Sequence, residues 1–239
     1  MKTMQADEII DEIEKIFPDA HCELSHQTPF QLLVAVVLSA QTTDAYVNRV
    51  TPALFEKWPD ASSLAQADLA DVEDVLRTLG LFHSKAKNII ALSRDLQERY
   101  QGEVPVSYKD LQSLAGVGRK TANVVRSVAF NIPSLAVDTH VNRVSKRLGL
   151  AKPEDSVEKV EEKLKRKISR SRWNQAHHDL IFFGRYFCMA RKPRCAECPF
   201  EDFCRKDRLE AYQKAMKEQA ALISNEKAAS AEQSDRKKA

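Results

Sequence analysis

The sequence predicts an all-α fold, and two observations support this prediction. Apolar residues recur at helical spacing along the chain, as in Ala6–Phe17, where isoleucines stand at positions 9, 10, 13 and 16. No segment shows the alternation of apolar and polar residues that marks a half-buried strand. Capping residues, glycines and prolines divide the chain into helices, and its 239 residues allow one large domain or two small ones.

Five helices are expected in the first hundred residues: Ala6–Phe17, Pro29–Ala40, Asp44–Trp58, Asp68–Leu79 and Ser84–Tyr100. The second of them has almost no polar residue, so we expect it to be buried on all sides. Asp44 and Ser84 are expected to be N-caps. Gly80 is expected to take the left-handed conformation that commonly follows the end of a helix.

Five further helices are expected over Ser107–Leu114, Thr121–Phe130, Asp138–Leu148, Asp155–Ile168 and Trp173–Met189. Ser107 and Asp138 are the expected N-caps of the first and third of these. Residues 212–239 contain few large apolar side chains and are expected to form a disordered tail, although Ala211–Ile223 could be a marginal helix.

The net charge of +3 conceals an asymmetry along the chain. Residues 1–100 hold 9 Lys and Arg against 16 Asp and Glu, whereas residues 140–210 hold 18 against 11. A basic region indicates a polyanionic partner, although solvated helix faces would give the same imbalance. The longest apolar run, Leu32–Leu38, is far too short to cross a bilayer. No signal peptide is evident, so we expect a cytoplasmic protein with no membrane partner.

One stretch concentrates residues with chemical potential. Gly116, Val117 and Gly118 precede a lysine, Lys120, and an aspartate, Asp138, follows eighteen positions later. Glycines before a helix leave backbone N–H groups free to hold an anion such as a phosphate. Lys120 could bind that phosphate or attack a group beside it, and Asp138 could be a site residue or a plain N-cap. The residues alone leave these alternatives open.

Four of the five cysteines fall within 17 residues, in the spacing C-x6-C-x2-C-x5-C: Cys188, Cys195, Cys198 and Cys204. A disulfide framework is not expected in an intracellular helical chain of this size. Four clustered thiolates instead indicate a metal, either structural zinc or an iron–sulfur cluster. Only one C-x2-C pair is present, and the wider loops favour the larger 4Fe–4S cluster, with zinc as the alternative.

Taken together, these features resemble the endonuclease III family of DNA glycosylases, which belongs to the helix–hairpin–helix superfamily. The resemblance runs from about Phe17 to Cys204. It rests on the hairpin LAGVGRKTANVV, the aspartate segment VDTHVNRVSKRLGL, the segments LSAQTTD and GLFHSKAKNI, and the cysteine spacing. Ala115 departs from the family pattern, which usually has proline there, and this could loosen the turn slightly.

The resemblance implies two helical lobes with a DNA cleft between them. A helical barrel lobe would span residues 22–132 and contain the helix–hairpin–helix at about 107–127. A cluster lobe would combine residues 1–21 with 134–211, and its loop 188–204 would hold a 4Fe–4S cluster on the four cysteines.

The resemblance also implies a bifunctional enzyme of base excision repair: a DNA glycosylase for oxidised pyrimidines that is also an AP lyase. Such an enzyme must flip the damaged nucleotide out of the duplex. Lys120 would attack C1′ of the sugar as a neutral amine, and Asp138 would stabilise the developing sugar cation. The resulting Schiff base would allow cleavage 3′ to the abasic site by β-elimination.

The same resemblance assigns the DNA contacts. Gln41 and Leu81 would fill the space that the flipped nucleotide leaves. The amides of Gly116 and Gly118 would hold a backbone phosphate. His140 and Arg191 are two further expected contacts with DNA.

Two other functions are weighed against this one. An adenine-mismatch DNA glycosylase would share the hairpin and the cluster, but that branch characteristically lacks a lysine at position 120. A non-catalytic module could bind DNA through the hairpin and zinc through the cysteines. The expected partner is double-stranded DNA with damaged pyrimidines or abasic sites, bound by a monomer in the bacterial nucleoid.

Overall fold

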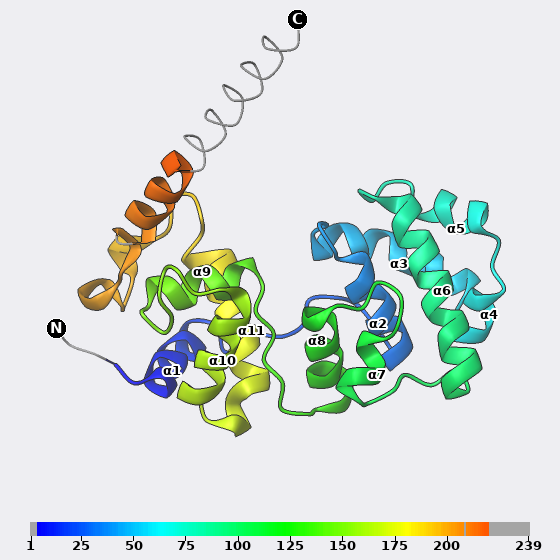
Figure 1. The fold of residues 1–239 in the computed structure, drawn as a ribbon, viewed down its shortest axis with the longest axis horizontal. Coiled ribbons are helices and arrows are strands. Elements are labelled where there is room, and N and C mark those ends of the chain that lie inside the picture. The colour runs from blue at the N-terminus through cyan, green and yellow to red at the C-terminus, as the bar shows by residue number, and fades with distance from the viewer. Residues whose placement is uncertain (1–3, 208, 220–239) are drawn as a thin grey trace, which may run out of the picture.

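The chain folds into two helical lobes that lie side by side and are joined by two segments without regular structure (Figure 1). The computed structural model describes residues 4–207 and 209–219. Within these residues every regular element is helical and no strand occurs. The predicted all-α fold with two lobes is confirmed.

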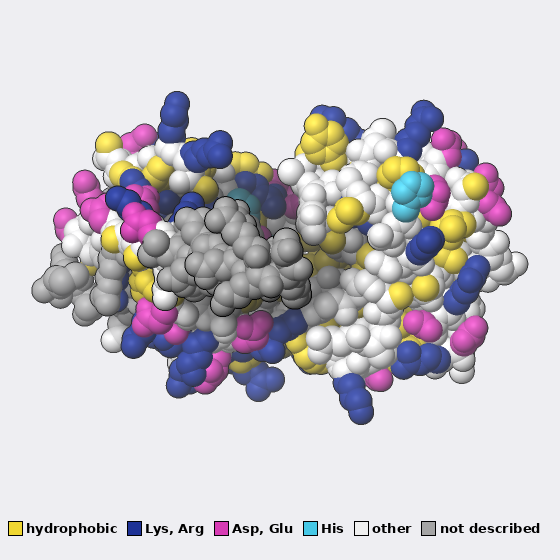
Figure 2. All heavy atoms as spheres, turned by 45° about the horizontal axis from the view of Figure 1, so that its top comes forward, with side chains coloured by type: hydrophobic (Ala, Val, Ile, Leu, Met, Phe, Trp, Pro, Cys, Tyr) yellow, Lys and Arg dark blue, Asp and Glu magenta, His cyan; other side chains and the backbone are white. Residues whose placement is uncertain are grey.

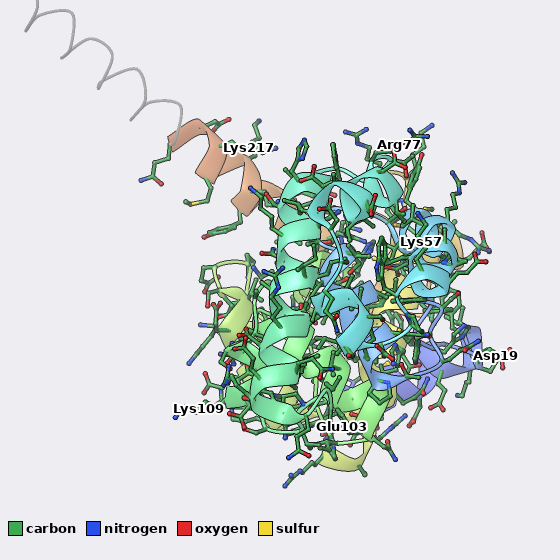
Figure 3. All side chains as sticks on the ribbon, turned by 90° about the vertical axis from the view of Figure 1, so that its right-hand side faces the viewer. Asp19, Lys57, Arg77, Glu103, Lys109 and Lys217 are labelled. Atoms are coloured by element: carbon green, nitrogen blue, oxygen red, sulfur yellow. The ribbon has the colours of Figure 1, made fainter. Side chains whose placement is uncertain are left out.

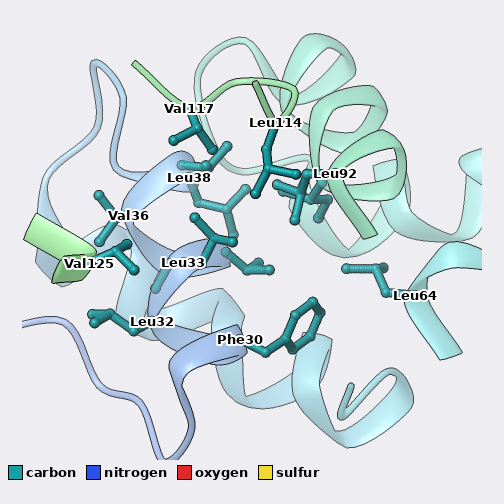
Figure 4. Close-up of a cluster of buried hydrophobic side chains, with 14 of the residues drawn as sticks. Phe30, Leu32, Leu33, Val36, Leu38, Leu64, Leu92, Leu114, Val117 and Val125 are labelled. Atoms are coloured by element: carbon teal, nitrogen blue, oxygen red, sulfur yellow. The ribbon is translucent and has the colours of Figure 1, made fainter. Parts of the chain in front are cut away.

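The first lobe consists of seven consecutive helices: α2 (Pro29–Leu38), α3 (Asp44–Lys57), α4 (Ala61–Ala65), α5 (Leu69–Leu76), α6 (Phe82–Tyr100), α7 (Tyr108–Gln112) and α8 (Arg119–Phe130). Its axis is α2, in which eight of the ten residues are buried. Thr28 caps this helix by accepting a hydrogen bond from the Gln31 amide, and Pro29 begins it with a preset φ. Side chains of α2 such as Leu33 and Leu38 point into one core with Leu92 and Leu114 (Figure 4).

The second lobe combines the start of the chain with its second half: α1 (Ala6–Ile16), α9 (Thr139–Arg147), α10 (Val157–Lys167) and α11 (Trp173–Phe182). A π-helical turn, η2 (Phe183–Phe187), continues α11 toward the cysteines. Ile9, Ile10 and Ile13 of α1 are at most 1% exposed and share a core with Phe183 and Phe200. The apolar face that periodicity predicts for α1 is therefore covered by elements from the other end of the sequence.

Several local expectations were wrong. Gly80 does not take the left-handed conformation; its neighbour Leu81 does, at φ 60°, and Leu81 rather than Ser84 stands immediately before α6. Thr43 rather than Asp44 is the N-cap of α3. The short helix α4 was not expected.

The predicted tail begins later than position 212. Residues 209–219 are helical, in agreement with the alternative of a marginal helix, and residues 220–239 lie outside the part of the chain that the structure describes.

The outer surface carries the charged side chains. Figure 3 shows Lys57, Arg77 and Glu103 pointing away from the first lobe. None of the described helices is long and apolar enough to cross a membrane.

Candidate active site between the lobes

One pocket lies where the two lobes meet, and both predicted catalytic residues line it. Lys120 comes from the start of α8 in the first lobe, and Asp138 comes from the segment that enters α9 in the second. The remaining lining includes His177, Ile181 and Arg185 from the second lobe, and Cys22, Glu23 and Asp44 from the other side. Figure 2 shows a notch between the lobes on the face in view. Residues far apart in sequence thus form one site.

The hairpin before α8 has the geometry of an anion site. Gly116 is left-handed at φ 75°, and Gly118 is the extended N-cap of α8. Among the described residues, the N–H groups of Gly116 and Gly118 and of the first turn of α8 find no intramolecular acceptor. Unpartnered amides at the positive end of a helix favour a negatively charged ligand.

Lys120 is the second residue of α8 and its side chain is exposed. Its neighbour Arg119 turns to the other lobe, where its Nε donates to Oε2 of Glu161 at 2.7 Å. Glu161 lies on α10, is 3% exposed and also accepts from Lys165 at 2.6 Å. This ion pair fixes the beginning of α8 against the second lobe and so holds the backbone from which Lys120 extends.

Asp138 is the N-cap of α9, as predicted. Its Oδ1 accepts hydrogen bonds from the amides of His140 and Val141, each at 2.8 Å. Its Oδ2 accepts none from the described residues. Two amide donors lock the carboxyl group in place while one oxygen stays available to the pocket. The N-cap interpretation and the site interpretation of Asp138 are therefore compatible.

Two histidines form the wall behind these residues. His177 is 2% exposed, and its Nδ1 lies 2.9 Å from the Ala136 carbonyl oxygen. Burial lowers the pKa of His177 to about 4 and that of His178 to about 3. Both rings are therefore neutral at pH 7 and add no positive charge beside Lys120. The sequence stage assigned them to a structural helix and gave no signal that they would line the site.

An ion-pair network at the pocket was missed by sequence reasoning. Arg185 pairs with Glu23, and its Nη2 donates to Oδ2 of Asp44 at 3.0 Å. The Tyr186 hydroxyl donates to the same Glu23 at 2.6 Å. Burial disfavours the charge on Arg185, but Asp44 and Glu23 more than offset this, and the pKa of Arg185 is raised. The network joins the lobes beside the catalytic pair.

Gln41 and Leu81 occupy two turns of the first lobe. Gln41 lies just after α2 and Leu81 just before α6, and both have positive φ, 55° and 60°. Left-handed backbone costs a side-chain-bearing residue about 1–2 kcal/mol. Leu81 is 58% exposed, which is unusual for leucine. Each turn thus presents one long exposed side chain on a strained backbone.

His140 is half-buried against the π-helical turn. A Cβ on Gly184 would lie only 2.9 Å from the His140 Cβ, so glycine permits this close approach. Nη2 of Arg143 lies 3.3 Å from His140 Nδ1 and donates to the Gly184 carbonyl at 2.7 Å. Burial, together with the charge of Arg143, lowers the pKa of His140, although Asp138 opposes this. The ring is neutral at pH 7 and sits one turn beyond Asp138.

The four cysteines line a second pocket, together with Arg147, Arg194 and Lys206. Among the described residues, no three His, Cys, Asp or Glu side chains converge on the position of one metal ion. Four thiols spread around a cavity suit a multi-iron cluster better than a single zinc ion, which needs all ligands about 2.3 Å away. Burial raises the pKa of Cys198 to about 11, and metal coordination would offset this by deprotonating the thiol.

One helix connects the two pockets. At its start, α9 is capped by Asp138; toward its end, Arg147 is 3% exposed and Nη1 donates to the Met189 carbonyl at 2.8 Å. The same nitrogen lies 3.4 Å from Cys188 Sγ. Arg191 stays exposed on the loop that follows. The cysteine loop therefore braces the helix that presents Asp138.

Comparison with known families gives two matches. Residues 34–170 match the family described as the HhH-GPD superfamily base excision DNA repair protein. Residues 188–204 match the iron–sulfur binding domain of endonuclease III. The second match spans the four cysteines, and the cofactor is a 4Fe–4S cluster.

Individual relatives agree with these matches. Endonuclease III of Bacillus subtilis is 53% identical over 197 residues, covering 82% of this chain and 90% of the relative. That of Escherichia coli K12 is 45% identical, with 82% and 93% covered. A solved structure titled a trapped endonuclease III–DNA covalent intermediate is 50% identical, with a TM-score of 0.83 over 87% of this chain and 100% of that one. The chain belongs to the endonuclease III family of base excision DNA repair proteins.

Proposed function

We propose that this DNA glycosylase and AP lyase removes oxidised pyrimidines from duplex DNA and cuts the strand 3′ to the resulting abasic site. The observation that carries the proposal is the shared pocket of Lys120 and Asp138 at the junction of the lobes. A primary amine and a carboxylate on separate, firmly held helix starts can act on one flipped nucleotide. The endonuclease III–DNA complexes among the structural relatives support double-stranded DNA as the partner.

The reaction follows from these two groups. Nζ of Lys120, as the free amine, attacks C1′, and the C1′–N bond to the base breaks with its electron pair leaving on the base, which is then protonated. The carboxylate of Asp138 stabilises the positive charge that develops on the sugar. The sugar ring opens to a Schiff base between Nζ and C1′, loss of a C2′ proton breaks the C3′–O bond, and hydrolysis releases the lysine.

Desolvation of Lys120 depends on the DNA. The side chain is exposed in the free protein, so the apolar surroundings that favour a neutral amine arise when the nucleotide enters the pocket. The amides of Gly116 and Gly118 would hold the neighbouring phosphate during this step, with His140 and Arg191 as further contacts. Gln41 and Leu81 would occupy the vacated position in the duplex.

The remaining proposals concern organisation. We assign residues 22–132 to the barrel lobe, with its helix–hairpin–helix at about 107–127, and residues 1–21 with 134–211 to the cluster lobe. The two separate cores support this division. The four cysteines would hold the cluster, which supplies the covalent framework of loop 188–204. The bacterial relatives support a cytoplasmic, nucleoid-associated enzyme.

Borohydride trapping tests the mechanism. The wild-type protein should form a covalent adduct with duplex DNA that contains an abasic site or an oxidised pyrimidine, and Lys120→Ala should form none. Lys109→Ala is the matched control because Lys109 is an exposed lysine of the same lobe. If the wild type nicks DNA without any trapped adduct, the Schiff-base mechanism is wrong. Binding without nicking or excision would instead favour the non-catalytic module.

A further inference from the structure

A buried lysine that the proposed reaction does not use lies near the two exposed turns. Lys85, on the first turn of α6, is 4% exposed. Among the described residues it forms no ion pair, and its Nζ donates to one group, the Thr42 hydroxyl, at 2.5 Å. Burial lowers the pKa of Lys85. Burying an amine without a carboxylate is costly, so this contact calls for a physical reason.

The contact joins two turns that lie 43 residues apart in the sequence. Thr42 directly follows Gln41, and the Lys85 amide donates to the Leu81 carbonyl at 3.0 Å in the first turn of α6. The Thr42 hydroxyl also reaches the Ala40 carbonyl at 3.5 Å. The bond therefore links the backbone on either side of Gln41 to the helix that begins after Leu81.

Both linked turns are strained, and strain of this kind persists only where neighbouring structure holds it. Gln41 and Leu81 each carry a side chain on left-handed backbone. Two exposed side chains that enter one duplex must also keep a fixed separation, because a shift of about 1 Å can cost roughly a hundredfold in rate. The Lys85–Thr42 bond is placed to hold that separation before DNA binds.

We propose that Lys85 is a positioning residue, which fixes the turns of Gln41 and Leu81 relative to each other through the Thr42 hydroxyl. The inference rests on the proposed function of Gln41 and Leu81 as side chains that fill the vacated space. Lys85 itself need not touch DNA. It preorganises the turns, so that binding energy is not used to order them.

A double-mutant cycle tests this role. Lys85→Met keeps the side-chain length without the amine, and Thr42→Val keeps the shape without the hydroxyl. Each should lower the single-turnover rate of excision from duplex DNA about tenfold, and the double variant should be no slower than either. Lys85→Arg, which keeps a donor, should recover most of the rate. Lys87→Met, at an exposed position of the same helix, should leave the rate unchanged.

A second background separates positioning from general stability. In Gln41→Ala/Leu81→Ala protein, which itself should excise slowly, Lys85→Met should cause no further loss. Loss by the same factor in both backgrounds, or additive effects in the cycle, would overturn the proposal. If Gln41→Ala/Leu81→Ala excises at the wild-type rate, the roles of those two residues are wrong and the inference falls with them.

The catalytic centre has its own control in the same experiment. A single-stranded abasic oligonucleotide leaves no space in a duplex to fill, so borohydride trapping on it should be equal for the wild type and every variant named above. Absence of trapping in the wild type refutes the proposed function itself. Trapping that falls only in the Lys85 and Thr42 variants refutes the positioning role, because those changes would then have damaged the catalytic centre.

Discussion

Replacing each hairpin glycine with alanine separates the two reasons for which this turn contains glycine. Gly116 is left-handed, and a Cβ there would lie 3.1 Å from the Cβ of Asn88 and from Cγ1 of Val37. At Gly118 the backbone is extended, with φ −91°, and nothing lies within 4 Å of an added Cβ. The fold thus requires glycine at 116, whereas at 118 it does not.

Gly116→Ala should therefore destabilise the protein. The left-handed conformation costs alanine about 1–2 kcal/mol, and the two close contacts add an overpacking cost of about 1–3 kcal/mol. In a chain of this size each kcal/mol lowers the melting temperature by about 2–4 °C. The expected decrease is on the order of 5–15 °C.

Gly118→Ala should leave the fold intact and weaken DNA binding. Alanine is a poorer N-cap than glycine, which limits the stability cost to about 1 kcal/mol. The added methyl group would stand beside amides that are proposed to hold a phosphate. A hydrogen bond to a charged group contributes about 1.5–3 kcal/mol, so its loss should raise the Kd for abasic duplex about ten- to a hundredfold.

Calorimetry and fluorescence anisotropy on both variants complete this test. The account predicts opposite patterns: a large fall in melting temperature for Gly116→Ala, and a large rise in Kd with little change in melting temperature for Gly118→Ala. A Gly118→Ala protein that binds abasic duplex as the wild type does would refute the assignment of that amide.

Three further predictions concern the second lobe. Asp179 is fully buried and burial raises its pKa from 3.8 to about 7; because the folded protein holds this proton more tightly, wild-type stability should fall by on the order of 2–4 kcal/mol as pH rises from about 4 through 7, and chemical denaturation of Asp179→Asn should show no such fall. Gly184→Ala should place a Cβ 2.9 Å from that of His140, lower the melting temperature by roughly 2–10 °C and slow excision, whereas an unchanged excision rate would show that α9 tolerates displacement. Purified protein should contain about four irons per chain and absorb as an iron–sulfur protein, Cys198→Ala should lose both signals, and a colourless zinc protein would contradict the cluster.

The features that sequence predicted well depend on nearby residues. The Ser107 hydroxyl accepts from the amide of Asp110, and Asp138 accepts from amides two and three residues later. An N-cap needs only its own helix, so residue type and position suffice. The buried helix α2 was equally evident because its sequence has almost no polar face.

The local errors came from tertiary context. Gly80 was expected to be left-handed because glycine pays least for that conformation, yet Leu81 takes it and stands exposed at the junction with α6. Asp44 was expected to be an N-cap, yet its carboxylate instead pairs with Arg185, 141 residues away. In both places a requirement of the site overrides the local preference.

The ion pairs between the lobes could not be predicted. Periodicity indicates which face of a helix is buried, but it does not identify the residue opposite. Arg185 and Glu23 are 162 residues apart, and Arg119 and Glu161 are 42 apart. Their pairing depends on how two separately packed cores meet. The buried amine of Lys85 is hidden from sequence for the same reason, since α6 there reads as an ordinary charged surface.

The central claim is that Lys120 forms the covalent bond to DNA. The most direct measurement is peptide mass spectrometry of the borohydride-trapped adduct on abasic duplex after digestion of protein and DNA. The account predicts the mass of the reduced sugar remnant on Nζ of Lys120, and on no other amine. A remnant on Lys85, on Lys87 or on the N-terminal amine, with Lys120 unmodified, would contradict it.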